Sequence, residues 1–170
     1  MRRWVAVAIG GIAAACSSST EPVAPSVTIT MHETAAGGTI GTVLVEDTDG
    51  GARFTPNLTG LTPGEHGFHV HENPDCGDSG KNAGGHYDPD NTGRHEGPYG
   101  NGHLGDLPRL PVNAAGVASV AVVAPRVRVS DLDGRALIVH AGGDNYSDEP
   151  AALGGGGARV ACGVVPPIGG

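Results

Sequence analysis

A chain of 170 residues with 30 glycines, 13 prolines and few aromatic side chains suits a single domain, and it is too rich in turn formers for a helical bundle. Its formal charge of −8 excludes a generally basic surface that would attract nucleic acid. The same charge would repel an anionic substrate unless positive side chains gather locally.

The N-terminal segment, residues 1–15, resembles a bacterial secretory signal. Arg2 and Arg3 precede an apolar stretch that ends in small residues, and this stretch is too short to span a bilayer as a helix. Cys16 and the polar "SSSTEPVAPS" after it resemble a lipoprotein processing site, at which Cys16 would carry a lipid and anchor the protein to the membrane. The alternative is an ordinary signal cut near an alanine. Both interpretations predict an exported protein of the periplasm or cell envelope.

The folded domain is expected over residues 26–168, after a tether at 16–25 that is rich in serine and proline. Strand patterns occur at 26–31, 38–47, 52–61, 67–72, 116–125, 135–141 and 154–165. The sequence shows no convincing amphipathic helix of three turns. The predicted fold class is all-β, an antiparallel Greek-key barrel or sandwich with one long loop that binds metal.

The long loop, residues 72–108, has almost no apolar run, so something other than hydrophobic burial must order it. Its chemistry-bearing side chains are His86, His95, His103 and Asp106. Three imidazoles and one carboxylate are enough for a closed tetrahedral site, and this donor set favours zinc. Metal binding would also order the loop, because the free energy of binding adds to that of folding.

A second group of histidines lies on the predicted strands. His69 and His71 are two residues apart, so in an extended strand they project from the same face, roughly 7 Å apart at Cα. His140 ends the apolar strand "RALIVH", where a core role explains a histidine poorly. Three imidazoles on rigid strands suit copper. His86 could supply a fourth if it loses both ring protons and bridges two metals.

Two histidines are expected outside these sites. His66 is an odd number of residues from His69 and His71 and would face the other way, which favours a structural role. His32 is expected to be a solvated surface residue, with a secondary role in capturing copper as the alternative.

Apart from Cys16, the chain has two cysteines, Cys76 and Cys162. An even pair in an exported protein predicts a disulfide. Closing so long a loop would stabilise the fold by about 4–5 kcal/mol on the chain-entropy model. The alternative is a pair of thiolate metal ligands.

From about Val27 to Val165, these motifs resemble the bacterial copper/zinc superoxide dismutases. "GFHVHE" is similar to the strand with two copper ligands, "AGGHYDP" to the segment with the bridging ligand, and "GRHEGPYGNGHLGDLP" to the zinc segment. "LIVHAGGDNYSD" is similar to the segment that completes the copper site, and "GGGGARVACGVV" to the C-terminal segment.

The resemblance implies one copper and one zinc ion per chain. The implied copper ligands are His69, His71, His86 and His140, and the implied zinc ligands are His86, His95, His103 and Asp106. It further implies that Asp144 links ligands of both metals, that Arg159 guides the substrate, and that Cys76 pairs with Cys162.

The implied activity converts superoxide to oxygen and hydrogen peroxide, with copper alternating between Cu(II) and Cu(I) and zinc in a structural role. His86 would be a bridging imidazolate and a local proton source. The expected partner is the superoxide anion, with no nucleic acid, and the protein would be a monomer or a homodimer. One departure is that many bacterial members have a lysine-bearing insertion where this chain has only "GDSGKNAGG", with Lys81 as its basic residue.

Two other functions fit parts of the pattern. A cupin-type metalloenzyme also places an H-x-H pair on a strand, but it needs a glutamate a few residues on, and Glu72 directly follows His71. A secreted metal buffer or delivery module is the non-enzymatic alternative. Such modules tend to lose a copper ligand or the arginine, and this chain retains both.

Overall fold

The computed structural model describes residues 24–168, so the proposed signal segment and Cys16 lie outside the described part of the chain. The strands are β1 (Ser26–Glu33), β2 (Thr39–Thr48), β3 (Gly51–Leu58), β4 (Gly64–His66), β5 (Phe68–His71), β6 (Leu110–Val112), β7 (Val122–Ala124), β8 (Ala136–His140) and β9 (Arg159–Val164). Three short 3-10 helices accompany them: η1 (Lys81–Ala83), η2 (Val129–Leu132) and η3 (Ala152–Gly155). Within residues 24–168 no helix is both long enough and apolar enough to cross a bilayer.

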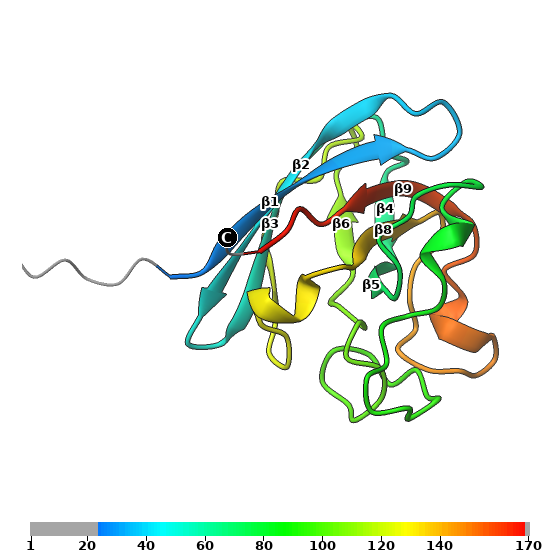
Figure 1. Ribbon diagram of the computed structural model, residues 1–170. Coiled ribbons are helices and arrows are strands. Elements are labelled where there is room, and N and C mark those ends of the chain that lie inside the picture. The colour runs from blue at the N-terminus through cyan, green and yellow to red at the C-terminus, as the bar shows by residue number, and fades with distance from the viewer. Residues whose placement is uncertain (1–23, 169–170) are drawn as a thin grey trace, which may run out of the picture.

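Seven strands form one curled antiparallel sheet in the order β5-β8-β9-β1-β2-β3-β7, and β4 pairs with β6 (Figure 1). Only Gly67 separates β4 from β5, so one stretch of chain pairs with β6 at one end and with β8 at the other. The hairpins β1–β2–β3 lie beside β9 and β8, which follow much later in the chain. The predicted all-β Greek-key class is confirmed.

The strands form because apolar side chains alternate with polar ones. In β1, Ile29 and Met31 are fully buried, whereas Thr28 and Thr30 are exposed, as the sequence pattern predicts. Phe54 of β3 and Phe68 of β5 meet edge to face, with ring centroids 5.7 Å apart. Most of the remaining core consists of valine, leucine and alanine, as expected for a chain with few aromatic residues.

Some predicted strands differ in length. The pattern at 116–125 yields only Val122–Ala124, because just three residues pair with β3. The short strands β4 and β6 were not predicted, since three residues are too few for an alternating pattern to show.

The loop 72–108 is positioned by backbone pairing with the outer edge of β5. Val70 N donates to Gly105 O and Val70 O accepts from Tyr87 N, both at 2.9 Å. A Cβ at Gly105 would lie 2.2 Å from Val70 O, so only glycine allows this approach. The pairing sets His86 opposite His71 and Asp106 opposite His69.

Candidate metal centre

The seven predicted ligands lie in one buried cluster. Each is less than one-tenth exposed, and they come from β5, the end of β8 and the long loop. Two groups of four have candidate ligand atoms within 4.8 Å of one another. These groups are His69, His71, His86 and His140, and His69, His86, His95 and Asp106.

Backbone carbonyls determine which nitrogen His71 and His140 present to the cluster. His71 Nδ1 donates to Gly84 O at 3.0 Å, and His140 Nδ1 donates to Gly157 O at 3.1 Å. Each ring therefore keeps an unprotonated Nε2, and these two atoms lie 3.4 Å apart. Such a pair of acceptor nitrogens can hold a metal ion.

His69 belongs to the same group as His71 and His140, but the ring nitrogen it leaves free is Nδ1 instead of Nε2. Its Nε2 donates to Asp144 Oδ2 at 2.8 Å, and its buried Nδ1 has no hydrogen-bond partner among the described residues. His86 Nε2 is also buried without a partner there, and the His69 and His86 ring centroids are 3.9 Å apart. Four imidazole nitrogens thus converge, which fits copper.

The neighbouring group surrounds Asp106. Its Oδ1 accepts from His86 Nδ1 at 2.9 Å and lies 3.4 Å from His103 Nδ1, and its Oδ2 lies 3.0 Å from His95 Nδ1. The Nδ1 atoms of His95 and His103 are buried and make no well-aligned hydrogen bond within residues 24–168. Three nitrogens and a carboxylate fit zinc. His103 lies at the periphery of this group, since it is not among the four residues whose candidate ligand atoms all lie within 4.8 Å of one another.

Asp144 joins the two groups. Its Oδ2 accepts from His69, and its Oδ1 accepts from His95 Nε2 at 2.8 Å and from Tyr146 N at 2.7 Å. Burial alone would raise the pKa of Asp144, but these hydrogen bonds lower it below its ordinary value. Gly154, at φ 74°, packs so closely that a Cβ there would lie 2.1 Å from Asp144 Oδ1.

The histidines divide into neutral and charged groups. Burial lowers the pKa of His69 to about 3, of His71 to about 2 and of His140 to about 4, so these rings are neutral and can each offer a nitrogen to a metal ion. Burial acts in the same direction on His95, but hydrogen bonds to Asp106 and Asp144 raise its pKa to about 9.

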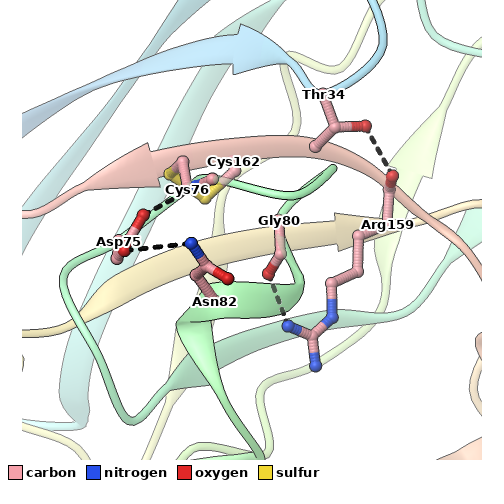
Figure 2. Close-up of a disulfide and its surroundings, with 8 residues drawn as sticks. Thr34, Asp75, Cys76, Gly80, Asn82, Arg159 and Cys162 are labelled. Atoms are coloured by element: carbon pink, nitrogen blue, oxygen red, sulfur yellow. Dashed lines mark hydrogen bonds between the residues drawn. A yellow bond between two sulfur atoms is a disulfide. The ribbon is translucent and has the colours of Figure 1, made fainter.

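Arg159 begins β9, and its charge acts on His71 and His140 of the imidazole-rich group. Its guanidinium donates to Gly80 O (Figure 2) and to Gly84 O, and the Gly84 carbonyl also accepts from His71. A hollow of about 220 Å³ is lined by Arg159, Lys81, Ser79, Gly157 and Ala158. Burial lowers the pKa of Arg159, but a guanidinium stays protonated at neutral pH.

The disulfide predicted from cysteine counting is present. Cys76 on the long loop is bonded to Cys162 on β9, with their Cα atoms 5.8 Å apart (Figure 2).

His66 agrees with its predicted structural role, because its buried ring nitrogens lie 2.6 Å from His140 O and 2.7 Å from Thr62 O.

Sequence reasoning missed the glycine carbonyls of Gly84 and Gly157. They contribute backbone atoms, so no side-chain motif could have identified them.

Fold and cluster together define a β-barrel protein with two adjoining candidate metal sites, one rich in imidazole and one containing a carboxylate. A sequence model of the family described as copper/zinc superoxide dismutase (SODC) matches residues 39–165. The chain belongs to the copper/zinc superoxide dismutase family.

Three comparisons illustrate the likeness. "Superoxide dismutase [Cu-Zn]" of Brucella abortus biovar 1 (strain 9-941) is 53% identical over 154 residues, covering 84% of this chain and 89% of that protein. The solved copper/zinc superoxide dismutase from Brucella abortus has a TM-score of 0.79 at 52% identity, covering 83% of this chain and 99% of that one. The solution structure of a monomeric copper, zinc enzyme from Salmonella enterica gives 0.73 at 50% identity, with the same coverage.

Proposed function

We propose that this protein is an exported superoxide dismutase that holds one copper and one zinc ion and converts two superoxide anions and two protons to oxygen and hydrogen peroxide. The observation that carries the proposal is the convergence of unpartnered or acceptor nitrogens of His69, His71, His86 and His140 beside a cationic arginine. Membership of the family supports the same activity.

Two sets of residues hold the metals. The proposed copper donors are His69 Nδ1 and the Nε2 atoms of His71, His86 and His140, and the proposed zinc donors are the Nδ1 atoms of His86, His95 and His103 with an Asp106 oxygen. When bound, copper supplies a one-electron couple between Cu(II) and Cu(I), whereas zinc has no redox chemistry.

His86 and Asp144 have complementary roles. His86 presents Nδ1 to the zinc side and Nε2 to the copper side, so it can serve as the bridging imidazolate and hold or release a proton at Nε2. Asp144 orients His69 and His95, one from each group, through its two oxygens.

Arg159 is the proposed guide for the anion. Its two carbonyl contacts fix a positive charge next to His71 and His140, in a protein whose overall charge repels superoxide. Lys81 lines the same hollow, but its ammonium lies 3.7 Å from the Asp78 carboxylate, which offsets part of its charge.

The proposed setting is outside the cytoplasm. A Cys76–Cys162 disulfide is typical of an oxidising compartment, which agrees with a signal at 1–15, a tether at 16–25 and a domain at 26–168. A lipid on Cys16 would anchor the protein to the membrane. The solved Salmonella enterica relative is described as monomeric, and this chain is expected to be a monomer or a homodimer.

The central test is a His140→Ala variant. Because this ring supplies one copper nitrogen and none on the zinc side, the variant should lose copper and turnover while keeping zinc and the fold. Elemental analysis, circular dichroism and superoxide turnover measure the three properties.

The matched control is His32→Ala, which removes an exposed imidazole and should keep both metals and full activity. Normal turnover in His140→Ala would refute the copper assignment. One copper and one zinc per chain in the parent protein, with no superoxide turnover, would instead favour a metal buffer.

A further inference from the structure

A second hollow opens beside the disulfide. It measures about 210 Å³ and is lined by His32, Glu33, Thr34, Gly37, Cys76 and Cys162. None of the proposed metal ligands is among these residues. Both half-cystines therefore face a space that could admit a small molecule, on a part of the surface that the proposed metal chemistry does not use.

The strand register places His32 next to Cys162. His32 of β1 is the direct cross-strand partner of Cys162 of β9, so their Cβ atoms are about 4.5–5.5 Å apart on one face of the sheet. The neighbouring residues identify that face. Met31 is buried in the core, and a Cβ at Gly163 would meet Met31 Sδ at 2.6 Å, so His32 and Cys162 share the opposite, outer face.

The two half-cystines, Cys76 and Cys162, differ in their exposure to solvent. Cys162 is 1% exposed and packs with Ala83, Ala136 and Ile138, whereas Cys76 lies on the covering loop and is partly exposed. An incoming thiol therefore reaches the Cys76 sulfur more easily. Cys162, beside His32, is then the sulfur that leaves.

We propose that this hollow is a thiol-exchange site, which accepts a small thiol or a dithiol and in which His32 assists the leaving sulfur. The incoming thiolate forms a bond to Cys76 Sγ as the Sγ–Sγ bond breaks, and the bonding pair goes to Cys162 Sγ. That sulfur takes a proton from a nitrogen of the His32 ring, which regains one from solvent. A second thiol then displaces Cys76, so that the protein disulfide is reduced and the thiols are oxidised to a disulfide.

The surrounding groups leave one His32 nitrogen available. Its Nδ1 lies 3.3 Å from Thr39 Oγ1, and Nε2 has no hydrogen-bond partner within residues 24–168. Glu33 is the other charged group lining the hollow. On the long loop, Asp75 accepts from Asn82 Nδ2 (Figure 2) and from Gly77 N, and these bonds hold the backbone around Cys76.

The first experiment determines which sulfur is attacked. The metal-loaded protein is treated with glutathione, quenched with an alkylating agent and examined by mass spectrometry for the cysteine that carries glutathione. The proposal expects the adduct on Cys76 and the alkyl group on Cys162. Glutathione mainly on Cys162, or equally on both, would overturn it.

The second experiment measures reduction of the disulfide by dithiothreitol. His32→Gln should slow reduction on the order of tenfold, because a general acid is lost while the size of the side chain is roughly kept. His32→Lys restores a cationic proton donor and should recover part of the rate. Thr30→Gln, an exposed change on the same face of β1, should leave the rate unchanged.

Equal rates in the parent protein and His32→Gln would overturn the role of His32. The rate should also rise in proportion to dithiothreitol concentration and be insensitive to mild urea. A reduction rate that rises with urea concentration would mean that the disulfide is reduced only after the protein unfolds, and the proposed site would be wrong. These readouts do not involve superoxide, so they stand or fall separately from the proposed dismutase activity.

Discussion

At the scale of single residues, the chemistry of the cluster depends on what the far side of each ring contacts. Gly84 O and Gly157 O accept from the Nδ1 atoms of His71 and His140, whereas Asp144 accepts from the Nε2 atom of His69. The ring nitrogen left for the proposed copper ion therefore differs between His69 and the other two histidines. A histidine motif alone does not contain that information, because the partners are mostly backbone atoms far away in sequence.

Arg159 provides a prediction at this scale. Arg159→Glu replaces the cation beside the proposed copper ligands with an anion, so turnover should fall about tenfold or more while both metals remain bound. Added salt slows the parent protein by screening attraction, and it should speed the variant by screening repulsion. Turnover measured across a sodium chloride series, together with elemental analysis, checks both expectations.

The control is Arg53→Glu, which makes the same charge change at an exposed position of β3, paired with Glu46. It should leave turnover nearly unchanged. If Arg159→Glu behaves like Arg53→Glu, the guiding role of Arg159 is wrong.

Spacing predicted that His69 and His71 share one face, because side chains alternate along a strand. His140 was selected because a core role explains it poorly, and the three loop histidines because their loop has almost no apolar run. For His66, alternation along the strand also led to the predicted structural role, but alternation alone does not explain which way the ring faces. Gly67 interrupts the pairing between β4 and β5, so the facing of His66 is set by its contacts to His140 O and Thr62 O. Asp144 and Arg159 were recognised only through family resemblance, since a lone aspartate or arginine has no distinguishing pattern.

At the scale of elements, β5 is paired along both edges, with β8 on one side and with the long loop on the other. Asp106 holds three histidines of that loop, His86, His95 and His103, to one another. Asp106→Ala should therefore weaken zinc binding and make residues 72–108 more sensitive to proteolysis. Limited digestion followed by mass spectrometry of the first cut sites measures this change.

Asp90→Ala is the matched control, because Asp90 lies in the same loop but is exposed. It should keep the resistance of the parent protein. An Asp106→Ala loop as resistant as that of Asp90→Ala would show that backbone pairing alone orders the segment, without a contribution from metal.

The long strands β1, β2, β3, β8 and β9 were predictable because each has enough residues to display an apolar pattern. The pairing of the loop with β5 was not, since it is made by backbone atoms around Tyr87 and Gly105. Sequence reasoning offered metal binding as a source of order in this loop, and hydrogen bonds among the described residues contribute as well. Arg126, for example, donates to Gly102 O and His103 O.

At the scale of the whole molecule, the buried titratable cluster makes the stability of the metal-free protein depend on pH. The folded-state pKa values of His69, His71 and His140 are about 3, 2 and 4, below the ordinary 6.5. Between about pH 4 and 6.5 the unfolded chain binds protons that the folded chain does not. Stability should therefore fall as pH is lowered, by about 1.4 kcal/mol per pH unit for each histidine.

His95 acts in the opposite sense. Its pKa is raised to about 9, so the stability it contributes is fully present below pH 6.5 and is lost as pH rises through 9. Urea midpoints of the metal-free protein should therefore be highest near pH 6.5–7 and fall on both sides, more steeply on the acid side. In His140→Ala, stability should fall less steeply as pH is lowered from 6.5 to 4, because one of the three histidines no longer contributes. A midpoint that does not change between pH 5 and 7 would contradict this account.

The class of fold was predictable from the whole chain because composition and strand spacing exclude most alternatives. The disulfide followed from counting cysteines, and the structure confirms it. The signal segment and the lipid on Cys16 remain predictions, as they lie outside residues 24–168.

The double pairing of β5 has a consequence for the behaviour of the protein in a crowded solution. If the segment around Tyr87 and Gly105 detached, the amide and carbonyl of Val70 would be left without partners along a bare sheet edge. Such an edge is a template onto which a strand from a second molecule can add. Keeping that segment docked thus protects the protein against self-association, whatever it contributes to turnover.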